Sequence, residues 1–586
     1  MMSGTNVNDW TIDYYIENKP TCNLILRNVH ILREIPSLNY FPLDDFRDGQ
    51  LVRYEGMVQD IRNPEHYYEN FEVKNLETGE CYLKSGMYRD IMKCAKNEQL
   101  NLESSNNKRD ERKTYVVISI PGLNPWAKEL NPPGKINSNS SCSNPAGKRS
   151  LEDDQGEPMD SSNLEPAPKK EKSDKHESQT DALDTDEKKP MVVSKEYLLN
   201  FPIPIDDGKS AIVKVYADCP TFKLNQLIEI IGFISKDPIL SHVNNSDEYL
   251  DNIEVQIHHP PASIIPRVHA IIAKPLLLIP ELTMQPEFLS HINMVRGDLH
   301  MVLSQLLFGD NLAADFVICH LLSSVYMRRD FLCLGNFPLN ITNFPRKFST
   351  FPKDIYNFLS KIVAKSHYFE CTLDALNELS LVPKKDYDSN RLTSGMLQLS
   401  KNTHLIIDET NLTSGQVSVS GQLNYRAISD LARFQKLSYD FKFYALDYET
   451  DIPVLILSKV KSFIPCIMQI PLKSDPETED MYAQVVEAAN QYLSGENRLN
   501  NIRYYLESCR RITFVPGEDI CSVIQEDFVE LRKVNKFVTA DNLHSMIVFA
   551  KLMAMSYGED SLTVERWKQA FGLENERMSR LPRRNE

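Results

Sequence analysis

Apolar side chains recur most regularly in the last hundred residues. Between residues 540 and 554 they follow steps of three and four, at Leu543, Met546, Ile547, Ala550 and Met553. This spacing places one apolar stripe along a helix. Residues 503–511, 520–531 and 562–571 show shorter helical patterns. We therefore predict a package of three or four helices over residues 501–586.

The amino-terminal part has a different pattern, in which short β-branched and aromatic runs alternate with turn residues. Such runs predict strands. They lie at residues 50–58, 67–73, 115–120, 211–217 and 227–234. Five strands of this length suit a small barrel of the oligonucleotide/oligosaccharide-binding (OB) type. We therefore predict an OB-like β domain formed by residues 1–126 and 197–262.

Residues 127–196 contain no Phe, Tyr or Trp and are rich in polar and charged residues. Such a segment buries too little apolar surface to offset its ordering entropy, so we predict a disordered acidic and basic linker. Within it lie two basic clusters, Lys148 with Arg149, and Lys169 with Lys170 and Lys172. They are read either as a bipartite nuclear import signal or as ordinary solvated charges.

From residue 263 to residue 500 the pattern becomes α/β. Helical segments at 287–308 and 312–327 precede short apolar runs at 331–334, 404–407 and 454–457. Helices alternating with short, continuously apolar strands predict a parallel sheet covered on both faces. This is the layout of a nucleotide-binding core.

A phosphate-binding loop is missing from this core. Such a loop needs Gly-x-x-x-x-Gly-Lys-Ser/Thr between a strand and a helix, so that backbone amides and the lysine surround the phosphates. The sequence Gly208-Lys209-Ser210 has Ile203 in place of the first glycine and precedes a strand-like run, which indicates a turn. Residues 333–343, where the loop is expected, hold a single glycine and Pro338. We therefore predict that the chain does not hydrolyse ATP.

An acidic pair, Asp408-Glu409, ends the apolar run HLIIDE. In P-loop ATPases such a pair holds Mg²⁺ and activates water. Without a phosphate loop the pair has nothing to act on. We interpret it as a relic that now serves structure, with a live site as the alternative.

Composition and the remaining motifs limit the function further. A formal net charge of −16 argues against a protein whose main task is to grip nucleic-acid phosphate. Eleven cysteines without a Cys-x-x-Cys pair predict reduced thiols and no zinc site. Tyr67, Tyr68 and Phe71 could stack on bases, but packing is the preferred interpretation. His258-His259 are improbable metal ligands, and Arg328-Arg329-Asp330 are expected to cap a helix.

The carboxyl-terminal helices resemble the helical lid of the minichromosome maintenance (MCM) helicase subunits. The resemblance rests on RYYLESCRR at residues 503–511 and on VTADNLHSMIVFAKLMAM at 538–555. In that family a lid helix typically opens with Thr-Ala-Arg, whose arginine reaches the nucleotide. Here the matching, sensor-like position is Asp541, and an acidic side chain would repel phosphate.

Together with residues 222–240 and 301–330, these segments make the whole chain resemble the family of MCM complex-binding proteins. The resemblance implies an α+β multidomain protein with a degenerate AAA+-like core at 263–500 and a lid-like domain at 501–586. It also implies a nuclear, non-catalytic partner of MCM helicase subunits, acting in their assembly and escort or in their release from chromatin during replication and sister chromatid cohesion. No metal, cofactor, small-molecule substrate or membrane is expected, and direct DNA binding is expected to be weak or absent. The alternative is an OB-fold protein of chromatin that binds single-stranded nucleic acid.

Overall fold

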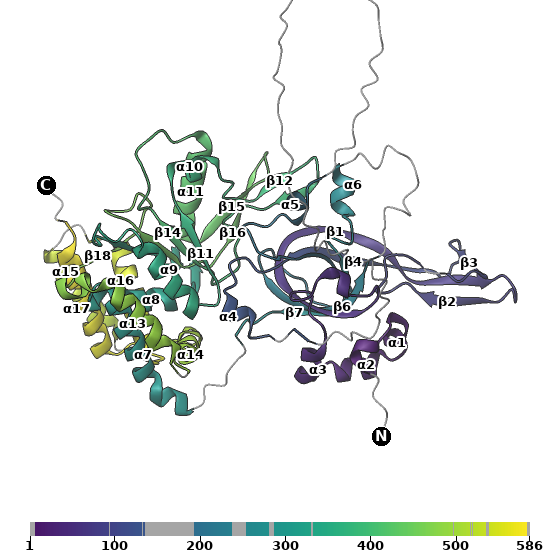
Figure 1. Ribbon diagram of the computed structural model, residues 1–586, viewed down its shortest axis with the longest axis horizontal. Helices are drawn as coiled ribbons and strands as arrows, with labels where there is room; N and C mark the ends of the chain where they lie inside the picture. The colour runs from purple at the N-terminus through teal and green to yellow at the C-terminus, as the bar shows by residue number, and fades with distance from the viewer. Residues whose placement is uncertain are drawn as a thin grey trace, which may run out of the picture.

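The computed structural model describes residues 6–582, except for 93, 132, 135–192, 237–252, 280–285, 330–331, 496, 516, 518–519 and 535–537. Within these residues the chain is an α+β multidomain protein with seventeen α-helices and several sheets (Figure 1). None of the described helices is both long and apolar enough to cross a membrane.

Five strands of the amino-terminal sheet form a closed ring. Their order is β1–β4–β5–β7–β6, and β6 pairs back onto β1. The β5–β7 pairing is parallel and the others are antiparallel. The ring strands are β1 (Leu51–Asn75), β4 (Lys108–Ile118), β5 (Ser210–Val215), β6 (Leu227–Ser235) and β7 (Arg267–Pro275). We refer to this ring as the closed sheet.

The closed sheet differs from the sequence prediction at two points. Residues 50–58 and 67–73 belong to one continuous strand, β1, and not to two strands. Pro64 within it lies in an irregularity of the β1–β4 register, between Arg62 and Glu65, where a proline is tolerated. In addition, β7 lies beyond the boundary expected at residue 262, yet it pairs with β5 and β6.

Two smaller parts adjoin the closed sheet. The second half of β1 extends as an arm with β2 (Cys81–Ser85) and β3 (Glu98–Asn101), to the right in Figure 1. Three amino-terminal helices pack against the sheet through an apolar cluster that includes Tyr15 and Phe233, whose ring centroids lie 5.8 Å apart. These helices are α1 (Ile12–Glu17), α2 (Lys19–Ile25) and α3 (Val29–Glu34).

A second sheet of five parallel strands forms the α/β core, in the order β11–β14–β17–β10–β18. The strands are β11 (Ser366–Glu370), β14 (His404–Asp408), β17 (Val454–Leu457), β10 (Leu339–Thr342) and β18 (Met468–Pro471). The helices that accompany it are α9 (Phe351–Ile362), α10 (Leu373–Glu378) and α11 (Val419–Phe434). The predicted parallel sheet and two of its three predicted strands are confirmed.

The third predicted strand, at 331–334, is not part of this sheet. Residues Leu332–Leu334 form β9, which pairs only with β8 (Met327–Arg329) among the described residues. Its place in the parallel sheet is taken by β10. A separate small sheet contains β13 (Arg391–Thr393), β12 (Lys384–Asp386), β15 (Lys436–Asp440) and β16 (Ala445–Glu449).

The carboxyl-terminal helices share one apolar core with the α/β part. Phe549 stacks on Phe316 with ring centroids 4.1 Å apart, and Arg296 reaches both Asp315 (2.6 Å) and Ser556 (3.0 Å). The predicted helical package is therefore confirmed as α14 to α17, and four preceding helices adjoin it. These helices are α7 (Pro286–Leu306), α8 (Asn311–Leu322), α12 (Pro476–Asp480), α13 (Tyr482–Ser494), α14 (Arg498–Arg510), α15 (Ile520–Val534), α16 (Ala540–Ser556) and α17 (Val564–Arg580).

Buried hydrogen bonds join the closed sheet to the α/β core. The Gln59 side chain donates to the Leu392 carbonyl (2.9 Å), and Asp60 accepts from the Leu392 amide (3.0 Å). Three short helices also belong to this part of the chain: α4 (Pro125–Lys128), α5 (Lys195–Leu199) and α6 (Ile253–His258). In α4, Trp126 donates to the carbonyls of Ser360 and Val363. In α5, the ring of Tyr197 lies 4.0 Å from the guanidinium of Arg391 in β13.

Candidate functional site

The carboxyl end of β14 carries the acidic pair that the sequence singles out. Asp408 is the last residue of the strand, with 3% of its surface exposed. The Tyr368 hydroxyl in the neighbouring strand donates to Asp408 Oδ2 at 2.5 Å, and the Thr410 amide donates to Oδ1 at 2.8 Å. Both carboxylate oxygens therefore already have donors from the chain itself.

Glu409, the second acid, is similarly engaged. It is 7% exposed, and Ser462 Oγ donates to its Oε1 at 2.7 Å. Burial raises the pKa of Glu409, and the hydrogen bond from Ser462 opposes this only in part. A carboxyl with a raised pKa and a bound hydroxyl is a poor ligand for Mg²⁺. The geometry thus suits a structural role for this pair.

The segment where a phosphate loop would lie is displaced from the predicted position. Because β10 ends at Thr342 and α9 begins at Phe351, the connecting loop is 343–350, not 333–343. This loop contains no glycine and includes Pro345. Its lysine, Lys347, lies 3.0 Å from Glu479 and 3.4 Å from Asp480. The loop therefore lacks the glycine backbone and the free lysine that hold phosphates.

Asp541 lies exposed in the first turn of α16. The helix begins with a capping box between Thr539 and Asn542. Within the described part of the chain, no hydrogen bond or ion pair joins Asp541 to Asp408 or Glu409. Its sensor-like role stays a prediction. The import-signal residues Lys148, Arg149, Lys169, Lys170 and Lys172 lie outside the described residues.

The proposed base-stacking residues are mostly buried. Tyr67 and Phe71 are 8% and 1% exposed, and Tyr67 packs edge-on against Tyr216 with centroids 5.1 Å apart. Tyr68 is half-buried, with the Arg109 guanidinium 4.8 Å from its ring centroid. The packing interpretation is confirmed for Tyr67 and Phe71.

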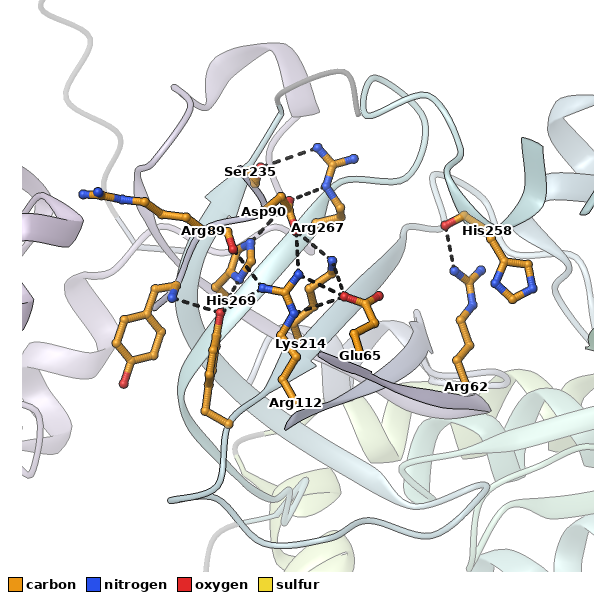
Figure 2. A network of polar contacts seen from close by, with 12 residues as sticks. Arg62, Glu65, Arg89, Asp90, Arg112, Lys214, Ser235, His258, Arg267 and His269 are labelled. Atoms are coloured by element: carbon orange, nitrogen blue, oxygen red, sulfur yellow. Dashed lines mark hydrogen bonds and ion pairs between the residues drawn. The ribbon is translucent and has the colours of Figure 1, made fainter. Parts of the chain in front are cut away.

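The outward face of β4, β5 and β7 carries buried cations that sequence reasoning missed (Figure 2). Alternate residues of these strands, such as Val213 and Val268, fill the inside of the closed sheet, so their neighbours Lys214 and Arg267 point outward. Asp90, from the segment after β2, lies among them. We call the set the Asp90 cluster: Glu65, Asp90, Arg112, Lys214, Arg267 and His269.

Asp90 neutralises this face. Its carboxylate lies 2.6 Å from Arg267 Nε, 2.7 Å from Lys214 Nζ and 3.3 Å from His269 Nε2. Burial alone would raise the pKa of Asp90, but the surrounding His269, Lys214 and Arg267 hold it well below its usual range.

Glu65 completes the cluster from β1. Burial raises its pKa, yet Lys214 and Arg112 together bring it down to about 2. The side chains of Arg112 and Lys214 are 6% and 5% exposed. These cations are therefore held by the chain's own acids and are closed off from a nucleic-acid backbone.

Two further candidates from the sequence are the histidine pair and the Arg328 segment. His258 ends α6, and burial lowers the pKa of both His258 and His259. The described residues contain no group of three or more His, Cys, Asp or Glu placed to hold a metal ion. Arg328 and Arg329 lie in β8 and not at the end of α8. Arg328 nevertheless caps a helix, because it donates to the carbonyl of Phe434 (3.2 Å), the last residue of α11. Asp330 lies outside the described residues.

Among the described residues, the two most exposed aromatic side chains lie on the β15–β16 hairpin. Phe443 and Tyr444, at its tip, are 78% and 54% exposed, and Leu446 is 43% exposed. Tyr387, 45% exposed, meets Phe443 with ring centroids 5.6 Å apart. A cluster of exposed aromatics on a rigid hairpin is typical of a protein–protein contact. We call these four residues the hairpin patch.

Helix α15 carries two neighbouring acids, Glu526 and Asp527, that differ in their surroundings. Glu526 is exposed, but Asp527 accepts a hydrogen bond from the indole of the buried Trp567 at 2.7 Å. Asp527 therefore holds two helices together, and it is not a free surface charge.

These parts define a multidomain protein with an engaged acidic pair and an exposed aromatic patch. The chain matches the family model described as "mini-chromosome maintenance replisome factor" over residues 22–581. The "mini-chromosome maintenance complex-binding protein" of Drosophila melanogaster is 35% identical over 572 residues, which cover 95% of this chain and 94% of the fly protein. The proteins of that name from Rattus norvegicus and Homo sapiens are 34% and 33% identical over 627 residues, covering 98% of this chain and 94% of each relative. The chain belongs to this family.

Proposed function

We propose that the protein is a non-catalytic binding partner of MCM helicase subunits. The observation that carries the proposal is the likeness, over nearly the whole chain, to relatives named for binding the MCM complex. The structure supports it, because Asp408 and Glu409 are occupied by Tyr368 and Ser462, and the 343–350 loop has no glycine. A protein built in this way recognises a partner through its surface.

The proposal extends to the domain types. The closed sheet is an OB-type barrel, supported by its five-strand ring and its order of pairing. The parallel sheet with an acidic pair at the carboxyl end of an inner strand is a degenerate AAA+-like core, and the helices after it form its lid. A subunit-like shape of this kind would occupy the lateral face of an MCM subunit that ring closure otherwise covers.

We further propose that the protein acts in the nucleus, in assembly and escort of subunits or in their release from chromatin during replication and cohesion. Direct DNA binding is weak or absent in this proposal, because the cations of the Asp90 cluster are already paired.

The hairpin patch provides the test. The full-length protein, tagged and incubated with nuclear extract, should retain MCM subunits, which mass spectrometry identifies. The double variant Phe443→Ser/Tyr444→Ser should retain at least tenfold less, since exposed aromatics dominate such contacts. The matched control is Leu76→Ser/Leu83→Ser, which removes two exposed apolar side chains from the arm. If neither the parent nor the control retains MCM subunits, the proposed function is overturned. If the hairpin variant retains them fully, the contact surface lies outside the hairpin patch.

A further inference from the structure

A cavity of about 280 Å³ lies where the closed sheet, the α/β core and helix α14 meet. Its walls are residues 225–227 and 275–279 of the closed sheet, 362–365 and 401–404 beside the core, and 503–511 of α14. Lys365 precedes β11, and His404 begins β14. The cavity therefore lies at the amino-terminal edge of the parallel sheet, opposite the edge that carries Asp408. Nucleotides in such sheets bind at the carboxyl edge, so this is a separate site.

The side chains around the cavity have an excess of positive charge. Glu507 is the single carboxylate among the described lining residues. The cations are Lys365, Lys401, Arg503, Arg510 and Arg511. Glu507 pairs with Arg511 at 2.8 Å, and Asp451, outside the cavity wall, pairs with Lys401 at 3.2 Å. Lys365 and Arg503 form no ion pair with a carboxylate in the described part of the chain, and Arg510 has only a long contact to Glu507, at 3.9 Å.

Lys365 is the deepest of these cations, with 4% of its surface exposed. Its ammonium donates to Ser400 Oγ (2.6 Å) and to the Lys401 carbonyl (2.5 Å), which are both neutral acceptors. Burial lowers the pKa of Lys365 to about 7, and the positive charge of Arg510 contributes. A buried ammonium without a counter-charge is costly unless an anion joins it.

Arg510 is compensated only in part, although its Nη2 donates to the Leu321 carbonyl. Its side chain is 13% exposed, and its contact to Glu507 is long, at 3.9 Å. Its Nη2 lies 3.2 Å from His404 Nε2, and its Nε has no hydrogen-bond partner among the described residues. Arg503 is held in place by Trp126, whose ring centroid lies 3.9 Å from the guanidinium. Planar guanidinium groups fixed in this way suit the oxygens of a phosphate.

We propose that this cavity binds a small phosphate-bearing anion, held by Lys365, Arg503 and Arg510. The volume suits one phosphorylated small molecule, because drug-sized sites begin at about 300 Å³. Its walls come from three parts of the molecule, so the bound anion ties α14, the α/β core and the closed sheet together. Such a ligand acts as a structural clamp and is no substrate, in keeping with a binding protein.

Thermal unfolding of the full-length protein tests the proposal, with inorganic phosphate titrated against sodium chloride at constant ionic strength. Parallel titrations use pyrophosphate and adenosine monophosphate. We expect the Tm to rise saturably by about 2 °C or more, because a ligand that binds only the folded state stabilises it. The strongest of the three probes identifies the source of the phosphate, whether a free anion or a phosphorylated metabolite.

The variants Lys365→Met and Arg510→Gln should lose the rise, whereas Lys459→Met, which removes an exposed lysine elsewhere, should keep it. Lys365→Met should fold, since it replaces an unpaired buried charge by an apolar side chain. Should Arg510→Gln fail to fold, Lys365→Met alone decides. No saturable rise with any probe, or an equal rise in Lys365→Met, would overturn the proposal, because only general salt effects would then remain.

Discussion

At the scale of single residues, Asp90 is the most consequential side chain outside the acidic pair. It is an acid with 1% exposure surrounded by three cations and a histidine. Replacing Asp90 by Asn should lower the free energy of unfolding by about 3–5 kcal/mol, because the cations remain buried without their counter-charge. Urea unfolding followed by circular dichroism measures this.

The matched control for that change is Asp13→Asn. Asp13 also pairs with an arginine, Arg89, but its side chain is 71% exposed. Removal of such a surface pair should change stability by less than about 1 kcal/mol. Equal effects of the two substitutions would mean that the Asp90 cluster is not what holds this face of the closed sheet.

Lys365 should make the free energy of unfolding depend on pH between pH 7 and pH 10. Its pKa is about 7 in the folded chain and about 10.4 when unfolded, so the unfolded state binds more protons between these values. Stability should therefore rise as the pH increases from 7 towards 10. In chloride buffer the free energy of unfolding of Lys365→Met should exceed that of the parent by a few kcal/mol at pH 7, on the order of the linkage expected for this shift. This difference between the two proteins should become smaller by pH 9.5.

Denaturant unfolding of both proteins at the two pH values measures that difference. The charged groups that act on Lys365 are Arg510, Glu507 and Asp451. A difference that stays constant from pH 7 to pH 9.5 would show that Lys365 keeps its proton in the folded state.

Individual residues differ in how far the sequence could predict them. Asp408 and Glu409 follow an apolar run, so their burial at a strand end was predictable. Their hydrogen-bond donors, Tyr368 and Ser462, lie far away in sequence and could not be predicted. Asp90 lies in the segment YRDIMK, which looks like ordinary surface chain. Its burial depends on partners from three strands that only the fold brings together.

At the scale of elements, α16 is the central helix of the carboxyl-terminal package. Phe549 packs against both Phe316 and Phe337, with ring centroids 4.1 and 5.9 Å away. Phe549→Ala should lower stability by about 3–5 kcal/mol, because it leaves a cavity in this stack. Thermal unfolding should show the loss, while Val529→Ala, at a position 52% exposed on α15, should leave the Tm unchanged. A small effect at Phe549 would mean that the package does not unfold with the core.

The residues of the apolar stripe predicted for α16 are buried to different extents. Met546, Ala550 and Met553 are buried, whereas Ile547 is half-buried. Periodicity finds the face of a helix, but the depth of each position depends on which helices pack against it.

Long strands were harder to predict than helices. The sequence Arg62-Asn63-Pro64 looks like a turn, and it hid the continuity of β1. In the structure two strands pair with β1 on opposite sides, and the register shift at Pro64 accommodates the missing amide. Tertiary pairing therefore outweighed the local turn signal.

At the scale of the whole molecule, strands from both sides of the long insert pair directly. Lys113–Ile118 of β4 pair with Ser210–Val215 of β5. Replacement of residues 135–192 by a short Gly-Ser linker should therefore leave the Tm within about 2 °C of the parent, since loop length changes closure entropy only slowly. Differential scanning calorimetry measures this. A separate, lower transition for the amino-terminal part would show that the insert contributes to folding.

The sequence separates the chain into successive parts, but the structure packs them closely. Gln59 and Asp60 bond to Leu392 across more than three hundred residues of chain. No local pattern marks such contacts, because each partner alone looks like an ordinary polar residue of a strand. The order of the parts was predictable, and their packing was not.

If the parallel sheet is the degenerate nucleotide-binding core proposed above, the engagement of Asp408 and Glu409 also bears on whether nucleotide hydrolysis could be regained. A return to nucleotide hydrolysis would require a glycine loop between β10 and α9, release of Asp408 from Tyr368, and release of Glu409 from Ser462. Each change alone would remove a packed contact without giving any activity. Under that proposal selection has no gradual path back to hydrolysis, and a lineage with this core would keep the proposed role as a binding partner even if its partners changed.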